Sequence, residues 1–144
     1  MPTLTAALRT DLLADTAIAA AVGTRIRPRK LEQAETLPAI RITVVSGQSE
    51  EHLRGASGLA HATVQIDAYA ASSEAADALA ELIRKRLCPA SGRRGLVGGL
   101  WMSGLSVQTD ASQIDEPIDD GGDHFRFITT RDFRISYAQD IASS

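Results

Sequence analysis

Six carboxylates gather in one short segment, and carboxylate oxygens are the ligands that calcium prefers in proteins. The six are Asp110, Asp115, Glu116, Asp119, Asp120 and Asp123. A calcium loop of the EF-hand type needs oxygen ligands at alternating positions, then a glycine, then a distal glutamate. Pro117 and Ile118 stand where ligands would be required. The segment is therefore predicted to be a polar loop that becomes ordered on meeting a partner, rather than a calcium site.

The other residue types that carry chemistry do not form a recognisable centre. His52, His61 and His124 share neither a helix nor a ligand spacing, so they predict polar contacts rather than a zinc site. Cys88 is the only cysteine, and no base near it in the sequence would activate it as a nucleophile. The glycines of residues 92–99 precede a strand and lack the Gly-Lys-Ser/Thr of a phosphate loop. No catalytic residue, metal or cofactor is predicted.

Two clusters of basic residues are of the kind that contacts nucleic acid. They consist of Arg25, Arg27, Arg29 and Lys30, and of Arg84, Lys85, Arg86, Arg93 and Arg94. Neither cluster has interleaved aromatic residues on which bases would stack. The sequence pI of about 5.6 is also acidic, whereas a dedicated binder is basic. DNA is therefore expected at most as a passing contact.

The composition is that of an ordinary water-soluble domain. The chain has 144 residues, 44% of them hydrophobic and 23% charged, and residues 1–144 are expected to form one domain with 139–144 as a flexible tail. Residues 1–94 carry 12 Lys/Arg and 10 Asp/Glu, whereas residues 95–144 carry 3 and 8. This asymmetry indicates either opposed faces for head-to-tail contacts or a solvated acidic loop. No signal peptide and no membrane-spanning segment are expected.

The pattern of apolar residues predicts an α+β domain with the element order α-β-β-α-β-β. Strands are expected over residues 39–46, 60–70, 100–109 and 124–137. One main helix is expected after Thr3 or Thr5, followed by a short helical segment capped by Asp15, and a second main helix runs from Ser72 or Ser73 to residue 87. Together they predict a four-stranded, mostly antiparallel sheet with two main helices packed on one face.

Two details of the strands are informative. The second strand has about 11 residues and would extend roughly 37 Å, against a usual length of 5–6 residues. Strands longer than a small core needs favour a protein that is gripped by its neighbours. In the last strand Arg131 would fall on the apolar face of Phe127 and Phe133, which predicts a bulge near Thr129–Thr130.

Several segments, taken in order, resemble a known family. They are residues 12–15, 19–26, Pro38, residues 55–60, residues 64–67 with Tyr69, the alanine-rich helix of residues 74–87, and residues 125–127, 132–135 and Tyr137. Their order and spacing resemble phage tail-completion proteins, which are the tail-terminator or head-to-tail joining proteins of long-tailed phages, prophages and gene transfer agents. The resemblance covers nearly the whole chain, and the acidic loop of residues 115–123 departs from it.

The resemblance implies a non-enzymatic structural protein of the virion. It implies a homo-oligomeric ring, typically of six subunits, that caps the tail tube and joins it to the head connector. The implied partners are copies of itself, the tail tube protein and a connector or adaptor protein, first in the host cytoplasm and then in the virion, with no membrane. Two alternatives remain: a head-completion adaptor on the connector side, and a small α+β enzyme or ligand-binding domain.

The contact surfaces are expected in two polar loops, because of their polarity and length. The first loop, residues 47–58, offers Ser49, Glu50, Glu51, His52 and Arg54. The second loop, residues 110–123, offers Asp110, Asp115, Glu116, Asp119, Asp120 and Asp123. Heterologous contacts through such loops suit a closed ring.

Overall fold

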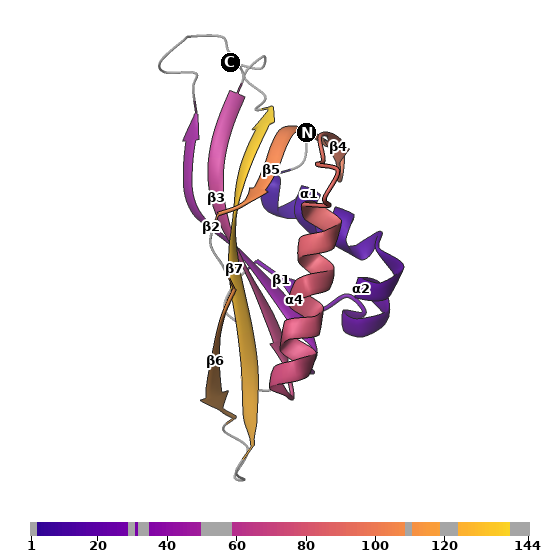
Figure 1. Ribbon diagram of the computed structural model, residues 1–144, viewed down its shortest axis with the longest axis vertical. Coiled ribbons are helices and arrows are strands. Elements are labelled where there is room, and N and C mark those ends of the chain that lie inside the picture. The colour runs from indigo at the N-terminus through magenta and orange to yellow at the C-terminus, as the bar shows by residue number, and fades with distance from the viewer. Residues whose placement is uncertain are drawn as a thin grey trace.

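The computed structural model describes residues 3–28, 31, 35–49, 59–108, 111–118 and 124–138. Long strands run along the length of the molecule, and the helices lie together against one side of its middle part (Figure 1). The strands extend beyond the helices at both ends of the long axis (Figure 1). The described residues thus form a central body with an extended arm at each end.

The described helices begin where the sequence predicts. They are α1 (Leu4–Leu13), α2 (Thr16–Val22) and α4 (Ser73–Leu87). The side chains of Thr3, Asp15 and Ser72 accept hydrogen bonds from the first free backbone N–H groups of the three helices. Gly23 ends α2 with a positive φ of 62°, a conformation that glycine adopts readily. The apolar stripe of α4 is buried in full: Ala76, Leu79, Ala80, Ile83 and Leu87.

The described residues form a sheet of seven strands, so the prediction of four was wrong. They are β1 (Ile26–Arg27), β2 (Ala39–Ser49), β3 (Leu59–Ala70), β4 (Gly95–Val97), β5 (Leu100–Val107), β6 (Ser112–Pro117) and β7 (Phe125–Ala138). The order is β1-β2-β3-β7-β5-β4, and β6 pairs with β7. Among these strands only β1 and β2 pair in parallel. The predicted strands correspond to β2, β3, β5 and β7; the other three are short and lack an apolar alternation.

Strand β7 is the central strand of the sheet and pairs with β3, β5 and β6. It pairs with β3 through all twelve residues of β3 without a register shift, so the predicted bulge near Thr129–Thr130 was wrong. Arg131 needs no bulge, because its Nη1 lies 3.9 Å from Oε2 of Glu81 on α4 instead of entering the apolar core. Bulges occur instead in β2, between Val44 and Ser46, and in β5, between Met102 and Gly104.

Along its other edge, β7 carries β5 and β6 one after the other. β5 pairs with the segment from Phe133 to Tyr137, and β6 pairs with the segment from Phe125 to Thr130. Between them the N–H of Gln108 donates to the carbonyl of Asp132 at 2.9 Å. The edge beside β7 is therefore one interrupted strand, of which β6 forms the half that reaches into the lower arm (Figure 1).

Two apolar clusters lie on the two faces of the sheet. The larger one fills the space between the helices and the sheet, and Leu8, Leu12, Ile83, Leu87 and Phe133 are among its fully buried members. The smaller one unites Leu31, Ala39, Tyr69 and Ile128. Ala39, Tyr69 and Ile128 follow one another across β2, β3 and β7, and side chains alternate along a strand, which sets them on the face away from the helices. The two main helices do pack on one face, as predicted. Among the described helices, none combines the length and the apolar character that crossing a membrane requires.

Candidate functional site

The predicted contact residues are found toward the two ends of the molecule. Ser49 is the last residue of β2 in the upper arm, whereas Asp115 and Glu116 lie in β6 in the lower arm (Figure 1). The other predicted contact residues lie outside the described part of the chain: Glu50, Glu51, His52, Arg54, Asp110, Asp119, Asp120 and Asp123. For Ser49, Asp115 and Glu116 the expectation of a loop was wrong. Backbone pairing with β3 makes Ser49 part of a strand, and pairing with β7 does the same for Asp115 and Glu116.

The lower arm is held to the body by a buried arginine. The Nε of Arg126, on β7, donates to Oε1 of Glu116 on β6, and Arg126 is 2% exposed. Its guanidinium carbon lies 5.0 Å from the centre of the Tyr69 ring, which suits a cation–π contact. Burial raises the pKa of the Tyr69 phenol, and the neighbouring Arg41 and Arg126 only partly oppose this. Tyr69 therefore stays neutral, and the acidic strand β6 is fixed to the smaller apolar cluster through Arg126.

A second set of polar contacts fixes β6 to α4. Oδ1 of Asp77, on α4, accepts hydrogen bonds from Thr129 Oγ1 at 2.7 Å and from Gln113 Nε2 at 3.1 Å. Gln113 Nε2 also donates to the carbonyl of Ser73 at 3.0 Å. These contacts line an open polar groove of about 550 Å³ between α4 and β6. The engaged carboxylate of Asp77 therefore helps to hold β6 against α4.

A row of polar side chains crosses the sheet where its two arms meet. Arg41, Asp67, Thr130 and Ser112 stand opposite one another on β2, β3, β7 and β6. Asp67 is buried, and its carboxylate accepts a hydrogen bond from Thr130 Oγ1 at 2.6 Å. Arg41 Nε lies 3.9 Å from the other oxygen of Asp67. From this row β6 continues toward one end of the molecule, and β2 continues toward the other.

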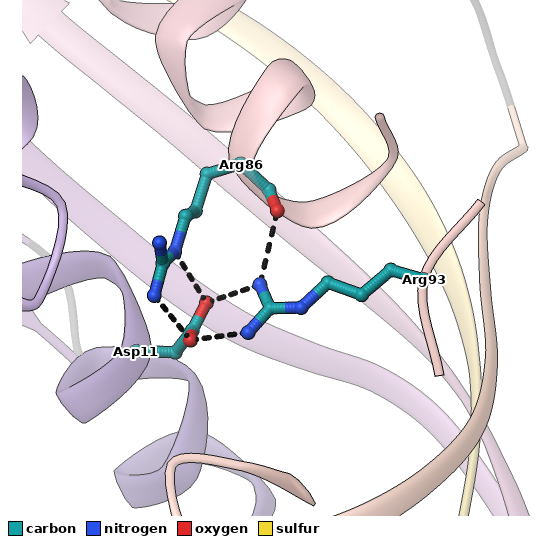
Figure 2. Close-up of polar contacts among 3 residues, drawn as sticks. All are labelled: Asp11, Arg86 and Arg93. Atoms are coloured by element: carbon teal, nitrogen blue, oxygen red, sulfur yellow. Dashed lines mark hydrogen bonds and ion pairs between the residues drawn. The ribbon is translucent and has the colours of Figure 1, made fainter. Parts of the chain in front are cut away.

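The centre of the molecule is clamped by one carboxylate between two arginines (Figure 2). Asp11, on α1, accepts two hydrogen bonds from Arg86 of α4, at 2.9 and 3.1 Å. It accepts two more from Arg93, in the segment before β4, at 2.6 and 2.7 Å. Arg93 also donates to the backbone carbonyl of Arg86 at 2.9 Å. Burial by itself would raise the pKa of Asp11, but the two guanidinium groups outweigh it and the pKa is lowered. The clamp joins three separate segments and keeps Asp11 ionised.

The structure describes the surroundings of Cys88 and of part of the two basic clusters. No group of three or more His, Cys, Asp or Glu side chains among the described residues is arranged to hold a metal ion. Burial raises the pKa of the Cys88 thiol, which lowers its reactivity as a nucleophile. Arg86 and Arg93, which the sequence suggested as nucleic-acid contacts, are engaged with Asp11.

Exposed apolar side chains mark surfaces that the sequence prediction did not identify. Among the described residues the most exposed are Leu96 at 71%, Ile114 at 59%, Val45 at 56%, Trp101 at 46% and Phe125 at 44%. Val45 and Ile114 lie in edge regions of the sheet, on β2 and β6. Two sequence signals mark them: Val45 follows Val44 and breaks the alternation of its strand, and Ile114 is an isolated apolar residue in an acidic run. Exposed apolar groups beside strand edges are typical of subunit contacts.

Comparisons with known proteins give the family and the fold. The family model described as tail completion protein gp17 matches residues 6–113. No curated protein sequence matches the chain significantly. Among solved structures, a chain in the virion of a native gene transfer agent particle has the same fold, with a TM-score of 0.59 and 18% identity over 94% of each chain. The family model spans most of the described body, and the chain therefore belongs to the tail completion protein gp17 family.

Proposed function

We propose that this protein is a structural component of a phage-type tail, which caps the tail tube and joins it to the head connector as a homo-oligomeric ring of six subunits. The observation that carries the proposal is membership of the tail completion family, through a match that extends from α1 to β6. The fold shared with a chain in a gene transfer agent virion supports a place in the virion.

The architecture suits a part that is gripped from both ends. The Asp11 clamp and the α4–β6 contacts stiffen the centre, while β2 and β6 extend from it in opposite directions (Figure 1). Asp11 and Asp77 accept hydrogen bonds from other side chains, and exposed apolar side chains such as Val45 and Ile114 lie on strands at the margins. Such a subunit presents different surfaces to its neighbours, as the heterologous contacts of a ring require.

The partners in this proposal are copies of the same chain, the tail tube protein and a connector or adaptor protein. Assembly takes place in the host cytoplasm, and the finished ring belongs to the virion, with DNA passing through it. Weak contacts by single subunits are sufficient, because a closed ring engages its partners at several points at once. The protein acts without a cofactor and without catalysis.

Electron microscopy of particles from a deletion strain tests the proposal. Loss of the protein is expected to give tails of uncontrolled length that are separate from filled heads, and a plasmid copy of the gene should restore normal particles. Tails of normal length beside heads that leak packaged DNA would instead assign the protein to the connector side, as a head-completion adaptor. Complete, infectious particles from the deletion strain would refute both assignments.

A further inference from the structure

Two strand edges are unpaired within the described part of the chain. On β2, the short strand β1 covers only Ile40 and Arg41, and Pro28 follows it immediately. The outer edge of β2 from Ile42 to Ser49 has no partner strand among the described residues. On the opposite side of the sheet, β6 pairs with β7 alone and leaves its other edge open. An open edge presents a row of backbone donors and acceptors that can bind another strand.

We propose that β6 of one copy pairs with the open part of β2 of a second copy, so that one sheet continues from subunit to subunit. This inference rests on the proposed function for the existence of a ring. Strand directions support it, because β2, β3, β7 and β6 are each antiparallel to the next. The next strand after β6 should therefore run in the direction of β2, and the β2 of a neighbouring copy continues this alternation.

The position of the two edges along the sheet supports a closed ring. Arg41 and Ser112 lie in the same row of paired residues across the four strands. From this row β6 extends toward one end of the strands, and the open part of β2 extends toward the opposite end. Their centres are about six residues apart, which is a stagger of about 20 Å at about 3.3 Å per residue. Four strands from β2 to β6, at about 4.8 Å each, give about 19 Å across the sheet. The ratio of this stagger to this width corresponds to a strand tilt of about 45°, and the strands of closed sheets are tilted by about 35–45°.

The exposed side chains indicate a register for the pairing of β6 with β2 of the next copy, which we call the seam. An antiparallel pairing that sets Ile114 opposite Val45 brings together two aliphatic side chains that are 59% and 56% exposed. The same register places Glu116 opposite Thr43 and diagonal to Arg41. Pairing of two β6 strands with each other would instead bring the acidic residues of both copies together, which is unfavourable. The seam therefore favours unlike edges over like edges.

A cysteine pair tests the seam directly. The variant carries Val45→Cys and Ile114→Cys together with Cys88→Ala, and directly opposite residues of an antiparallel pair have the Cβ separation that a disulfide needs. Mild oxidation is expected to give a ladder of covalent oligomers on non-reducing gels, which collapses to monomer on reduction. The matched control replaces Val45→Cys by Leu96→Cys, because Leu96 is more exposed but lies away from the seam. Each single-cysteine variant should remain monomeric.

The oxidation is carried out on concentrated purified protein and on particles from the deletion strain complemented with the variant. Both substituted side chains are exposed, so thermal melting should match that of Cys88→Ala alone. A ladder in either preparation supports the seam, whereas its absence in both, or an equal ladder from the Leu96 control, overturns it. A disulfide-linked dimer without larger oligomers would support the strand pairing but refute a sheet that continues around a ring. Rings that form without disulfide-linked oligomers would refute only the pairing of β6 with β2. Disulfide-linked oligomers, combined with normal particles from the deletion strain, would refute only the proposed function.

Discussion

Removal of the Asp11 carboxylate should destabilise the whole protein, since this group joins α1, α4 and the segment before β4 (Figure 2). The substitution Asp11→Ala deletes four hydrogen bonds to guanidinium groups and leaves two cations facing each other. Breaking a buried ion pair by removing one partner costs about 3–5 kcal/mol. Here the carboxylate is 4% exposed, but the side chains of Arg93 and Arg86 are 20% and 30% exposed and can partly rehydrate. We therefore expect a loss of about 3 kcal/mol, at the lower end of that range.

Urea denaturation followed by circular dichroism measures this loss. With a denaturant slope of about 2 kcal/mol per molar urea, the midpoint should fall by about 1.5 M. The matched control is Arg84→Ala, which removes another acid–arginine contact, at 2.5 Å from Glu81 on the exposed surface of α4, and keeps the contact of Glu81 with Arg131. Exposed pairs contribute little, so its midpoint should stay within the error of the measurement. The reasoning is refuted if the two variants lose equal stability, or if Asp11→Ala unfolds at the wild-type midpoint.

Three further predictions concern single positions. The pKa of Asp11 is lowered in the folded protein, so the ionised carboxylate contributes its full stabilisation above its unfolded-state pKa of about 4. This stabilisation is lost as the pH falls through the folded-state pKa, and the stability difference between wild type and Asp11→Asn should therefore narrow below about pH 4. A difference that stays constant in urea titrations at acid pH would contradict this. Gly98→Ala places a Cβ 1.9 Å from the carbonyl oxygen of Ala7 and should lower the melting temperature strongly. The control Gly92→Ala meets no atom within 4 Å, so it should lose only the roughly 1 kcal/mol that a side chain costs at a positive φ. Equal falls in melting temperature would refute the close packing of Gly98 against Ala7. Since burial raises the pKa of the Cys88 thiol, iodoacetamide at pH 8 should alkylate it several-fold more slowly in native protein than in urea, and equal rates would show an accessible thiolate.

The helices could be predicted because their signals are local. For α4, the cap at Ser72, the apolar stripe and the basic last turn lie within one stretch of sequence, and the structure contains each of them. The long strands β2, β3 and β7 were also predictable, because their side chains alternate between a buried and a more exposed face. In these elements the local preference and the tertiary environment agree.

Strand β6 could not be predicted, because its cause is not in its own residues. Ser112–Pro117 is polar, acidic and ends in proline, which are signals of a loop. It becomes a strand because the first half of β7 has a free edge there and because Asp77 and Arg126 bind its side chains. Strand β1 is similar, since two residues have too little pattern to predict a strand. Pairing with a distant partner decides the structure of both segments.

The central clamp was likewise invisible in the sequence. Asp11 is separated by 75 residues from Arg86 and by 82 from Arg93, and no spacing rule connects positions so far apart. The sequence analysis therefore left both arginines in one cluster of basic residues that could contact nucleic acid. The buried carboxylate explains their role, because a charge removed from water requires partners of opposite sign. Basic clusters in such a domain are better interpreted after possible acidic partners in the core have been considered.

The open edges of this fold must bind a partner without causing general aggregation. The edge of β6 carries residues that oppose pairing with a copy of itself. Asp115 and Glu116 of β6 would meet the same acids in a second β6. The contact between β6 and β2 avoids this repulsion, since Arg41 and Thr43 border the edge of β2 instead of acids. Selectivity between unlike edges thus follows from the same residues that made β6 resemble a loop in the sequence.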